Sequence, residues 1–422
     1  MKKRLEKINL FNKNSSVLFA TFAVYIKGER LPSNGMIEPI LSFFLPKVKD
    51  FTLLIQPHPG SDRISPIIQL YKNGMKMSNR IISSILYLPL YLLCKIQNND
   101  STHISFKIRD FLSVLYSGFA LGKKHDLLIG FESINALAGI MLRKFGRVNT
   151  VIYYVSDFSP KRYKNSYFNA VYLWLDAFCV EHADFTWDVS PAIKEARLQA
   201  GFLHIGIDKI LHVPNGLFDS QIDSLPISKR IPESIVYMGL LNPDQHGVDL
   251  ALKAFKLVLE KKPGSTFHVI GGTNRDENPF MEMVRDLGIE DSVISYGFIP
   301  PNQKMSRIIN KCCIGVATYR LDKDPRNRYG DSGKIKQYLA CGLPIVATTL
   351  QWYTRHVIEK GAGIGVEETP EDFARAIITL FEDQELYKSC SEKAVELSRN
   401  NTWENSYANA FIQMQHLTFA QK

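Results

Sequence analysis

The stretch Tyr329–Thr348 (YGDSGKIKQYLACGLPIVAT) contains the residue types and spacing most readily linked to chemistry. It starts as a polar loop in which Asp331 or Ser332 can cap a helix. Lys334 and Gln337 are three residues apart and therefore share one face of that helix. A helix N-terminus beside a lysine suits an anion such as a diphosphate. An ordinary loop–helix–strand unit with a surface lysine has the same pattern.

Two carboxylates follow expected strands closely. Glu132 and Asp157 each come a residue or two after an apolar run, and functional side chains in parallel sheets gather at the carboxyl ends of strands. A partly desolvated Asp157 at such a position would be basic enough to take a proton from a hydroxyl group. The competing interpretation is a turn cap next to Ser156.

Metal ligation is not indicated by the sequence. Asp322 and Asp324 have the spacing of a metal-binding DxD pair, but they lie in a polar, proline-containing loop, which favours a solvated turn. The six cysteines show no metal-type spacing and read as reduced core thiols of a cytosolic protein. We therefore expect no metal and no other cofactor.

The elements that position these residues alternate between strand and helix. In the first half, a helix of about a dozen residues separates the last two of four expected strands, a rhythm that predicts a parallel sheet. These strands are expected at residues 17–24, 51–55, 126–130 and 150–155.

The second half repeats the alternation after a boundary near residues 213–216. Strands are expected at residues 234–238, 265–270, 292–296 and 314–318, and a fifth is expected within the stretch 329–348. The sequence thus predicts an α/β protein with two Rossmann-like domains facing across a cleft. We expect a first domain of residues 1–214, with a C-terminal helix at 401–422 packing back on it, and a second of residues 215–400.

Composition and charge are those of a soluble globular protein, with 45% hydrophobic and 22% charged residues among 422. The net charge of +9 lies in the first 120 residues, where 16 Lys and Arg face 7 Asp and Glu. No basic run interleaved with aromatics marks a nucleic-acid groove, so an anionic membrane surface ranks first as the acidic partner and no nucleic acid is expected.

One apolar run bears on membrane contact. Residues 81–94 are the most apolar of the chain but are fewer than the roughly 20 that a spanning helix needs. Lys72, Lys76 and Arg80 precede the run and Lys95 follows it, a pattern typical of an interfacial helix. The competing interpretation is a core helix of the N-terminal domain. No secretory signal is recognised. We expect a cytoplasmic protein that rests peripherally on the inner face of the membrane.

Several motifs resemble those of GT-B glycosyltransferases: Val213-Pro-Asn-Gly, Tyr237-Met-Gly-Leu-Leu and Lys334 to Pro344. More narrowly, residues 125–345 are similar to the GumK-type glucuronosyltransferases of xanthan synthesis. That similarity runs through Asp126–Ser133, Tyr154–Asp157, Phe267–Gly271, Ser295–Gly297, Gly315–Tyr319, Asp331–Tyr338 and Gly342–Pro344.

The resemblance implies a UDP-sugar donor in the second domain. Lys334 would neutralise the diphosphate, Gln337 would reach the nucleotide and Tyr319 would line the same site. Gly239 would let a loop approach the diphosphate closely, and Asp157 matches the catalytic aspartate of the family. The implied donor-binding set is Gly239, Leu241, Phe298, Tyr319, Asp331, Ser332, Gly333, Lys334 and Gln337. On the acceptor side we name Glu132 and His58, although a histidine between prolines is more often structural.

Some positions depart from these families. Phe298 stands where the GumK type has a glutamate, and Gly333 replaces a bulkier residue. Gln337 stands where the broader retaining class has a glutamate, and that class has an arginine and a lysine at the positions of Leu240 and His246. The donor sugar therefore stays open, with glucuronate as one candidate.

The function implied is inverting, metal-independent transfer of a sugar from UDP to a lipid-linked or polysaccharide acceptor, with Asp157 as general base. The nearest alternative is a retaining GT-B transferase of the family 4 type, in which Asp157 would not be a base. A UDP-sugar epimerase would need no acceptor, and a non-catalytic protein would bind the nucleotide sugar without turnover.

Overall fold

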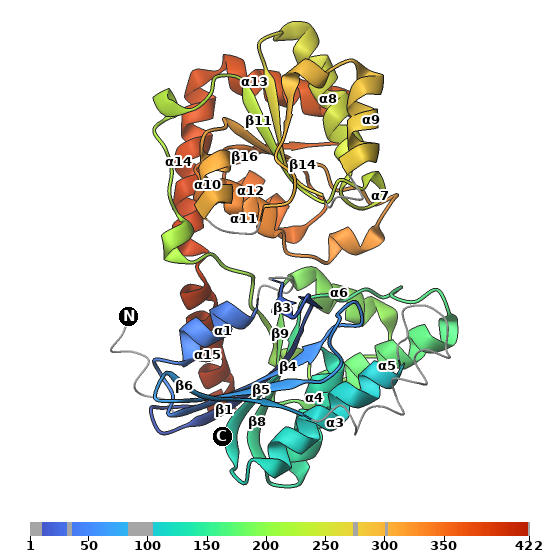
Figure 1. Ribbon diagram of the computed structural model, residues 1–422, viewed down its shortest axis with the longest axis vertical. Helices are drawn as coiled ribbons and strands as arrows, with labels where there is room; N and C mark the ends of the chain where they lie inside the picture. Colours follow the sequence, from blue (N-terminus) through green and yellow to red (C-terminus); the bar gives the residue numbers. More distant parts are fainter. Residues whose placement is uncertain (1–10, 32–35, 83–103, 273–276, 300–302, 421–422) are drawn as a thin grey trace. The chain divides into compact units, whose positions relative to one another are not determined.

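A computed structural model describes residues 11–31, 36–82, 104–272, 277–299 and 303–420 of the chain (Figure 1). The chain divides into two compact units. Unit 1 comprises residues 1–213 and 407–422, and unit 2 comprises residues 214–406. The chain thus leaves unit 1 once and returns to it through its last helix, α15 (Trp403–Ala420).

Unit 1 is built on a sheet whose strand order is β10-β9-β8-β7-β1-β4-β5-β6. The strands from β10 to β4 are parallel, whereas β4, β5 and β6 pair antiparallel. The central strands are almost continuous apolar runs because both of their faces are covered. The strands are β1 (Ser16–Ala23), β4 (Asp50–Pro57), β5 (Ile67–Lys72), β6 (Met75–Ile81), β7 (His125–Phe131), β8 (Val148–Val155), β9 (Phe185–Asp188) and β10 (Ile210–His212).

Neighbouring residues of β8 show how the two faces of this sheet are covered. The Tyr153 hydroxyl donates to Asp176 of α5 at 2.7 Å, whereas the Tyr154 ring lies 5.5 Å from that of Trp187, which in turn contacts Phe411 of α15. Successive side chains of a strand point to opposite faces, so α5 and α15 lie on opposite sides of the sheet. The helices of this unit that precede α15 are α1 (Ile37–Phe44), α3 (Ile104–Ala120), α4 (Ser133–Lys144), α5 (Ser166–His182) and α6 (Pro191–Ala200).

Unit 2 contains a parallel sheet in the order β13-β12-β11-β14-β15-β16. Tyr237 packs into the core on the α8 and α13 side, and its neighbour Val236 packs into the core that contains Tyr338 of α11. The strands are β11 (Ser234–Gly239), β12 (Thr266–Gly271), β13 (Val293–Ser295), β14 (Ile314–Ala317), β15 (Ile345–Thr348) and β16 (Gly363–Val366). The helices are α7 (Pro243–His246), α8 (Val248–Lys261), α9 (Glu277–Leu287), α10 (Gln303–Asn310), α11 (Gly333–Ala340), α12 (Trp352–Glu359), α13 (Pro370–Glu382) and α14 (Gln384–Asn400).

The predicted α/β alternation is confirmed in both halves of the chain. The four strands expected in the first half are β1, β4, β7 and β8, and the helix expected between the last two is α4. The prediction of a parallel sheet is wrong at one edge, where β5 and β6 form a hairpin. Its turn residues Asn73 and Gly74 both have positive φ, 50° and 81°, as the primed two-residue turns of hairpins require.

The segments expected at the membrane are only partly described. Lys72, Lys76 and Arg80 lie on the β5–β6 hairpin, whereas most of the apolar run 81–94 and the basic N-terminus lie outside the described residues. Among the described helices, none combines the length and the apolar character that crossing a membrane requires.

Candidate functional site

The stretch Tyr329–Thr348 forms a loop, helix α11 and strand β15, as the sequence predicts. Ser332 is the N-cap of α11, and its hydroxyl accepts a hydrogen bond from the backbone N–H of Ile335 at 3.3 Å. The same hydroxyl lies 2.9 Å from that of Tyr319, which follows β14. Ser332 and Tyr319, both predicted donor-site residues, therefore lie together at the N-terminus of α11. Gly333, the first residue of α11, has open space on its side-chain side within the described part of the chain.

Lys334 brings a buried amine to this helix end. The side chain is only 6% exposed, and among the described residues its Nζ atom has no hydrogen-bond partner. Nζ lies 4.9 Å and 4.7 Å from the ring centroids of Tyr237 and Tyr319, whose π faces attract a cation. Burial lowers the pKa of Lys334 to about 7. An anion arriving here would supply a hydrogen-bonded partner and restore the charge.

Two glycines let the backbone come close to this amine. A Cβ atom at Gly239 would lie 2.8 Å from His246 Nδ1 and 3.0 Å from Lys334 Nζ. One at Gly271, on the neighbouring strand β12, would lie 1.8 Å from the Gly239 carbonyl oxygen. Both residues have positive φ, 149° and 144°. Side chains are therefore excluded at both positions, and the backbone edge next to Lys334 stays open.

His246 lies beside Gly239 and Lys334, and the sequence analysis did not predict it as a site residue. Its Nδ1 accepts a hydrogen bond from the backbone N–H of Leu240 at 3.2 Å, and its ring centroid lies 5.7 Å from that of Tyr319. Burial, and next the charge of Lys334, lower the pKa of His246 to about 3. The ring is thus neutral near pH 7 and carries its proton on Nε2. Because His246 ends the short polar helix α7, the sequence around it gives no signal strong enough to select it.

Three other predicted donor residues have side chains engaged elsewhere. Asp331 is buried in an ion pair with Lys336 at 2.8 Å and accepts from the backbone N–H of Asn215 at 2.6 Å. Leu241 is 3% exposed and belongs to the apolar core. The Gln337 amide donates to Ser306 Oγ of α10 at 3.2 Å. The side chains of Asp331 and Leu241 thus lie in an ion pair and in the apolar core, and their contacts with a donor stay predictions.

Phe298 differs from these three because it is open to solvent. Its side chain is 62% exposed. It follows Gly297, whose carbonyl oxygen accepts from the backbone N–H of Gly271 at 2.9 Å. The chain at Phe298 therefore runs beside the Gly239–Gly271 pair, where an exposed ring is available to a ligand.

In unit 1, Glu132 directly follows β7 and has an unusual backbone. Its φ of 66° and ψ of 164° lie in a region that is essentially restricted to glycine. Its Oε1 accepts from the backbone N–H and the hydroxyl of Ser156, at 3.2 Å and 3.3 Å. Burial raises the pKa of Glu132 to about 7, although nearby Arg162 opposes the shift. This carboxyl group can bind or release a proton near neutral pH.

Asp157 does not meet the expectation of a desolvated base. Its side chain is 56% exposed, and Oδ2 lies 2.9 Å from Arg162 Nη1. The same Arg162 nitrogen donates to the Asp157 carbonyl oxygen at 2.7 Å. The predicted desolvation is therefore wrong, because Asp157 sits in a solvated ion pair, and Glu132 is the carboxylate that burial makes basic.

His58 follows β4 at the carboxyl edge of the same sheet. Its side chain is exposed, and Nδ1 accepts from the backbone N–H of Gly60 at 3.3 Å. Its ring centroid lies 5.7 Å from that of Phe22, which lies 5.5 Å from that of Phe131. Because Phe131 directly precedes Glu132, an aromatic row leads from His58 towards Glu132.

Each aspartate of the DxD-like pair, Asp322 and Asp324, forms an ion pair with an arginine. Asp322 pairs with Arg320 at 2.7 Å, and Asp324 pairs with Arg326 at 2.8 Å. Asp324 also caps a short 3-10 helix, Pro325–Arg328. Within the described residues, no group of three or more His, Cys, Asp or Glu side chains is arranged to hold a metal ion. Metal independence of the protein stays a prediction.

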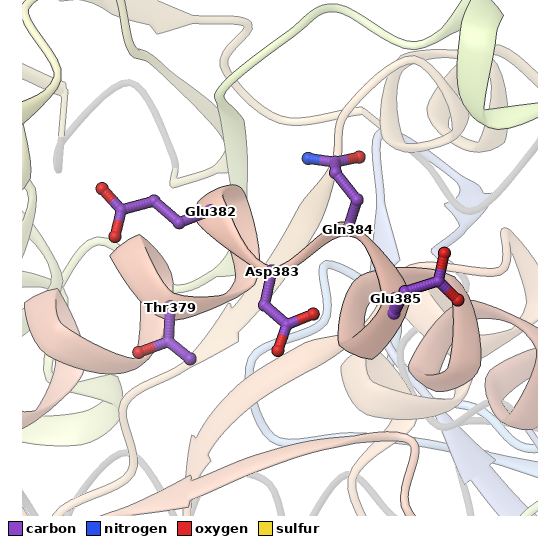
Figure 2. Close-up of a pocket in the computed structure, with 5 residues that line it drawn as sticks. All are labelled: Thr379, Glu382, Asp383, Gln384 and Glu385. Atoms are coloured by element: carbon purple, nitrogen blue, oxygen red, sulfur yellow. The ribbon is translucent and has the colours of Figure 1, made fainter.

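A surface hollow at the junction of α13 and α14 lies away from these groups. Figure 2 shows Thr379, Glu382, Asp383, Gln384 and Glu385 around it, with the three carboxylates pointing in different directions. Asp383 caps α14 by accepting from the backbone N–H of Leu386 at 2.9 Å, and Glu382 pairs with Lys262 at 3.1 Å. The acidic lining repels a diphosphate, so this hollow is not the anion site.

Residues 232–383 match the family model described as "Glycosyl transferases group 1". The matched segment lies within unit 2. It contains the Gly239, Lys334 and His246 group described above. A curated relative, the D-inositol 3-phosphate glycosyltransferase of Corynebacterium glutamicum (strain R), is 23% identical over 185 residues. That match spans 42% of this chain and only 41% of the relative's length.

Solved structures extend the likeness to the whole fold. The Anabaena protein Alr3699/HepE in complex with UDP matches 94% of this chain and 99% of its own, with a TM-score of 0.64 at 14% identity. The sucrose-phosphate synthase of Thermosynechococcus elongatus matches 97% of this chain and 100% of its own, with a TM-score of 0.66 at 13% identity. The chain has the GT-B fold, with two Rossmann-like sheets, as predicted.

The comparisons also bear on two finer predictions, the inverting reaction and the GumK-type resemblance. The group 1 match favours the retaining, family 4-type alternative over the inverting one. The resemblance to GumK-type glucuronosyltransferases gains no support from these comparisons.

Proposed function

We propose that the group 1 glycosyltransferase domain of this chain binds a UDP-sugar at the N-terminus of α11 and transfers the sugar with retention of its anomeric configuration. The proposal rests on the buried amine of Lys334, which lies beside the backbone of Gly239. Among the described residues, this amine has no hydrogen-bond partner. Such an amine costs free energy until an anion pairs with it. The UDP-bound relative Alr3699/HepE supports the choice of nucleotide.

The chemistry of this site follows from where charge builds during transfer. As the bond from the sugar to the diphosphate breaks, negative charge accumulates on the leaving phosphate oxygens. Lys334, the N-terminus of α11 and the Nε2–H of His246 are fixed groups that stabilise that charge. No metal step is needed in this scheme, because the lysine takes the place of a cation.

Unit 1 is assigned the acceptor, which we propose is a lipid-linked sugar or a polysaccharide. Glu132 is the group suited to accept a hydrogen bond from the acceptor hydroxyl, because burial makes it more basic than an exposed carboxylate. Asp157 is left the role of holding Arg162, with which it pairs. In a retaining reaction Asp157 is not required as a base.

The first test is calorimetric titration with UDP, using GDP for comparison, of wild type, Lys334→Ala and Lys360→Ala. Lys360 is an exposed lysine in the same unit, so its loss changes the net charge equally. We expect Lys334→Ala to weaken UDP binding about tenfold to hundredfold and Lys360→Ala to leave it unchanged. Equal UDP affinity for wild type and Lys334→Ala would contradict the proposal.

Proton uptake gives a second, independent readout of the same titration. Lys334 has a pKa of about 7 in the free protein, and a bound diphosphate must raise it. Wild type should therefore take up a proton on binding UDP above about pH 7, and its affinity should fall as the pH rises. Lys334→Ala should lack this uptake, which is measured by repeating the titration in buffers of different ionisation enthalpy.

The outcome of the reaction separates the alternatives. The anomeric NMR signal of the product shows whether the sugar keeps its configuration. An inverted product would indicate an inverting transferase. Interconversion of UDP-sugars without an acceptor would indicate an epimerase. Binding without turnover across acceptors would indicate a non-catalytic protein. UDP-glucose, UDP-galactose and UDP-glucuronate compared side by side would identify the donor.

A further inference from the structure

Helix α3 has its polar and apolar faces reversed relative to an ordinary surface helix. The side chains it buries include Ser105, Arg109, Ser113 and Ser117. The large apolar side chains it exposes are Ile104, Ile108, Leu112, Tyr116 and Phe119, each between 41% and 47% exposed. They are spaced four, four, four and three residues apart and so form one stripe. A helix against water normally has the opposite arrangement.

The buried polar face fixes this orientation. Arg109 donates to the carbonyl oxygens of Pro57 at 2.6 Å and Ile64 at 3.1 Å, and it pairs with Asp110 at 2.6 Å. The Ser113 hydroxyl lies 3.1 Å from the amide of Gln56 on β4. Turning α3 to hide its apolar stripe would leave these buried polar groups unpaired, which costs more than the exposed stripe does. The apolar stripe therefore faces outward by construction.

The stripe continues onto the next helix. Phe145, just after α4, is 62% exposed, and its ring centroid lies 5.9 Å from that of Phe119. Figure 1 shows α3 and α4 side by side in unit 1. We call the exposed surface formed by Ile104, Ile108, Leu112, Tyr116, Phe119 and Phe145 the α3 patch.

Basic side chains border the α3 patch. Lys107 is exposed on α3 itself, and Lys124 and Lys144 are exposed near its C-terminal end. Arg147 lies 5.9 Å from the ring centroid of Phe119. The acidic residue of this helix, Asp110, is already paired with Arg109. An apolar stripe bordered by cations is the pattern of a surface that lies in the interface of an anionic bilayer.

We propose that the α3 patch docks unit 1 on an anionic lipid surface, with the apolar stripe entering the headgroup–acyl boundary and the lysines meeting lipid phosphates. Charge complementarity favours this occupant. A second copy of the chain would bring the same basic border against itself, which costs free energy. The proposal is independent of the donor site in unit 2.

The test is co-sedimentation of the full chain with vesicles of phosphatidylcholine alone or mixed with phosphatidylglycerol. We expect wild type to bind the mixed vesicles, to bind the neutral ones far less, and to lose binding as salt is raised. The double variant Leu112→Glu/Tyr116→Glu should lose at least about tenfold in affinity, because charged side chains cannot enter the apolar boundary. Lys124→Gln/Lys144→Gln should lose about fivefold for each lysine.

The matched control is Ile227→Glu, which places a carboxylate on a similarly exposed apolar residue, 39% exposed, in unit 2. It should bind vesicles as wild type does. All variants should melt as wild type does and bind UDP equally, since the altered side chains are exposed and lie outside the donor site.

Three results of the vesicle assay would overturn the proposal: no binding of wild type to the mixed vesicles, equal binding to both kinds of vesicle, and undiminished binding by the double variant. A wild-type dimer in analytical ultracentrifugation that the double variant abolishes would also overturn it, because a second copy would then occupy the patch. So would a large drop in the melting temperature of the double variant, since another part of the chain would then cover the stripe.

Discussion

Glu132 combines a strained backbone with a buried carboxyl group. A non-glycine residue at its φ and ψ costs on the order of 1–3 kcal/mol, and such residues gather at functional sites. The two hydrogen bonds from Ser156 to its carboxylate help to hold the residue in this conformation. Glycine would fit the backbone better. The presence of a carboxylate at this position is therefore best explained by what the carboxylate does.

The variant Glu132→Gln tests whether the buried carboxyl group of Glu132 has a raised pKa and a role in transfer. The folded-state pKa of Glu132, about 7, is raised from 4.5, so the folded protein binds a proton between these pH values that the unfolded chain does not. Wild-type stability should therefore fall as the pH rises through that interval. Glutamine does not titrate, so the variant should be stabilised relative to wild type at about pH 8 and lose that advantage near pH 4.5.

The measurement is thermal melting of both proteins across the pH range. Glu132→Gln should also remove the part of the pH dependence of transfer that Glu132 contributes near neutrality, leave the part that comes from Lys334, and leave UDP affinity intact. Parallel stability curves for the two proteins would show that Glu132 has an ordinary pKa and would remove the argument for its role.

The position of Ser332 and Lys334 at the N-terminus of a helix could be predicted from the sequence and is confirmed. Lys334 and Ser332 follow from the loop–helix signature, because capping and helix spacing are local properties. The backbone of Glu132 and the ion pair of Asp157 could not be predicted, since both depend on how α4 and the segment after β8 meet. His246 was passed over because a lone histidine becomes informative only when Lys334 and Gly239 are placed beside it.

At the scale of elements, the N-terminus of α11 depends on one hydroxyl group. Ser332 Oγ accepts from Ile335 and contacts Tyr319. Ser332→Ala removes the cap, which should lower the free energy of unfolding by about 1 kcal/mol. It should also weaken UDP binding, because the frayed helix end no longer holds its N–H groups and Lys334 in place. Urea unfolding and UDP titration measure the two effects.

Thr369→Ala is the matched control for this prediction. Thr369 caps α13 by accepting from the backbone N–H of Asp372 at 3.2 Å. Its loss should cost a similar amount of stability without changing UDP affinity. If both variants weaken UDP binding alike, the effect is global and the cap of α11 has no special part in it.

Element types and order were more predictable than sheet edges. The buried central strands show as apolar runs, which any parallel α/β sheet requires. The β5–β6 hairpin was missed although Asn73-Gly74 is a strong turn signal, because the alternation of strands and helices dominated the reading. The reversed faces of α3 could not be predicted, since helical periodicity locates an apolar stripe without telling which side meets the protein.

At the scale of the whole molecule, the last helix completes unit 1. Phe411 of α15 is buried and contacts Phe11, Phe43, Phe44 and Trp187. Phe411→Ala should cost about 3–5 kcal/mol and lower the melting transition of unit 1 alone. Phe255→Ala, in the core of unit 2, should lower the other transition. Differential scanning calorimetry resolves the two, and a single shared transition lowered by both variants would contradict separate folding.

The path of the chain also sets an order of events during synthesis. The aromatic core of unit 1 stays uncovered until residues 407–414 emerge, and the whole of unit 2, residues 214–406, is translated in between. At about 5–20 residues per second, that interval lasts roughly 10–40 s. The unit made first is therefore finished last. During that interval its exposed aromatic surface is a ready target for chaperones on the ribosome.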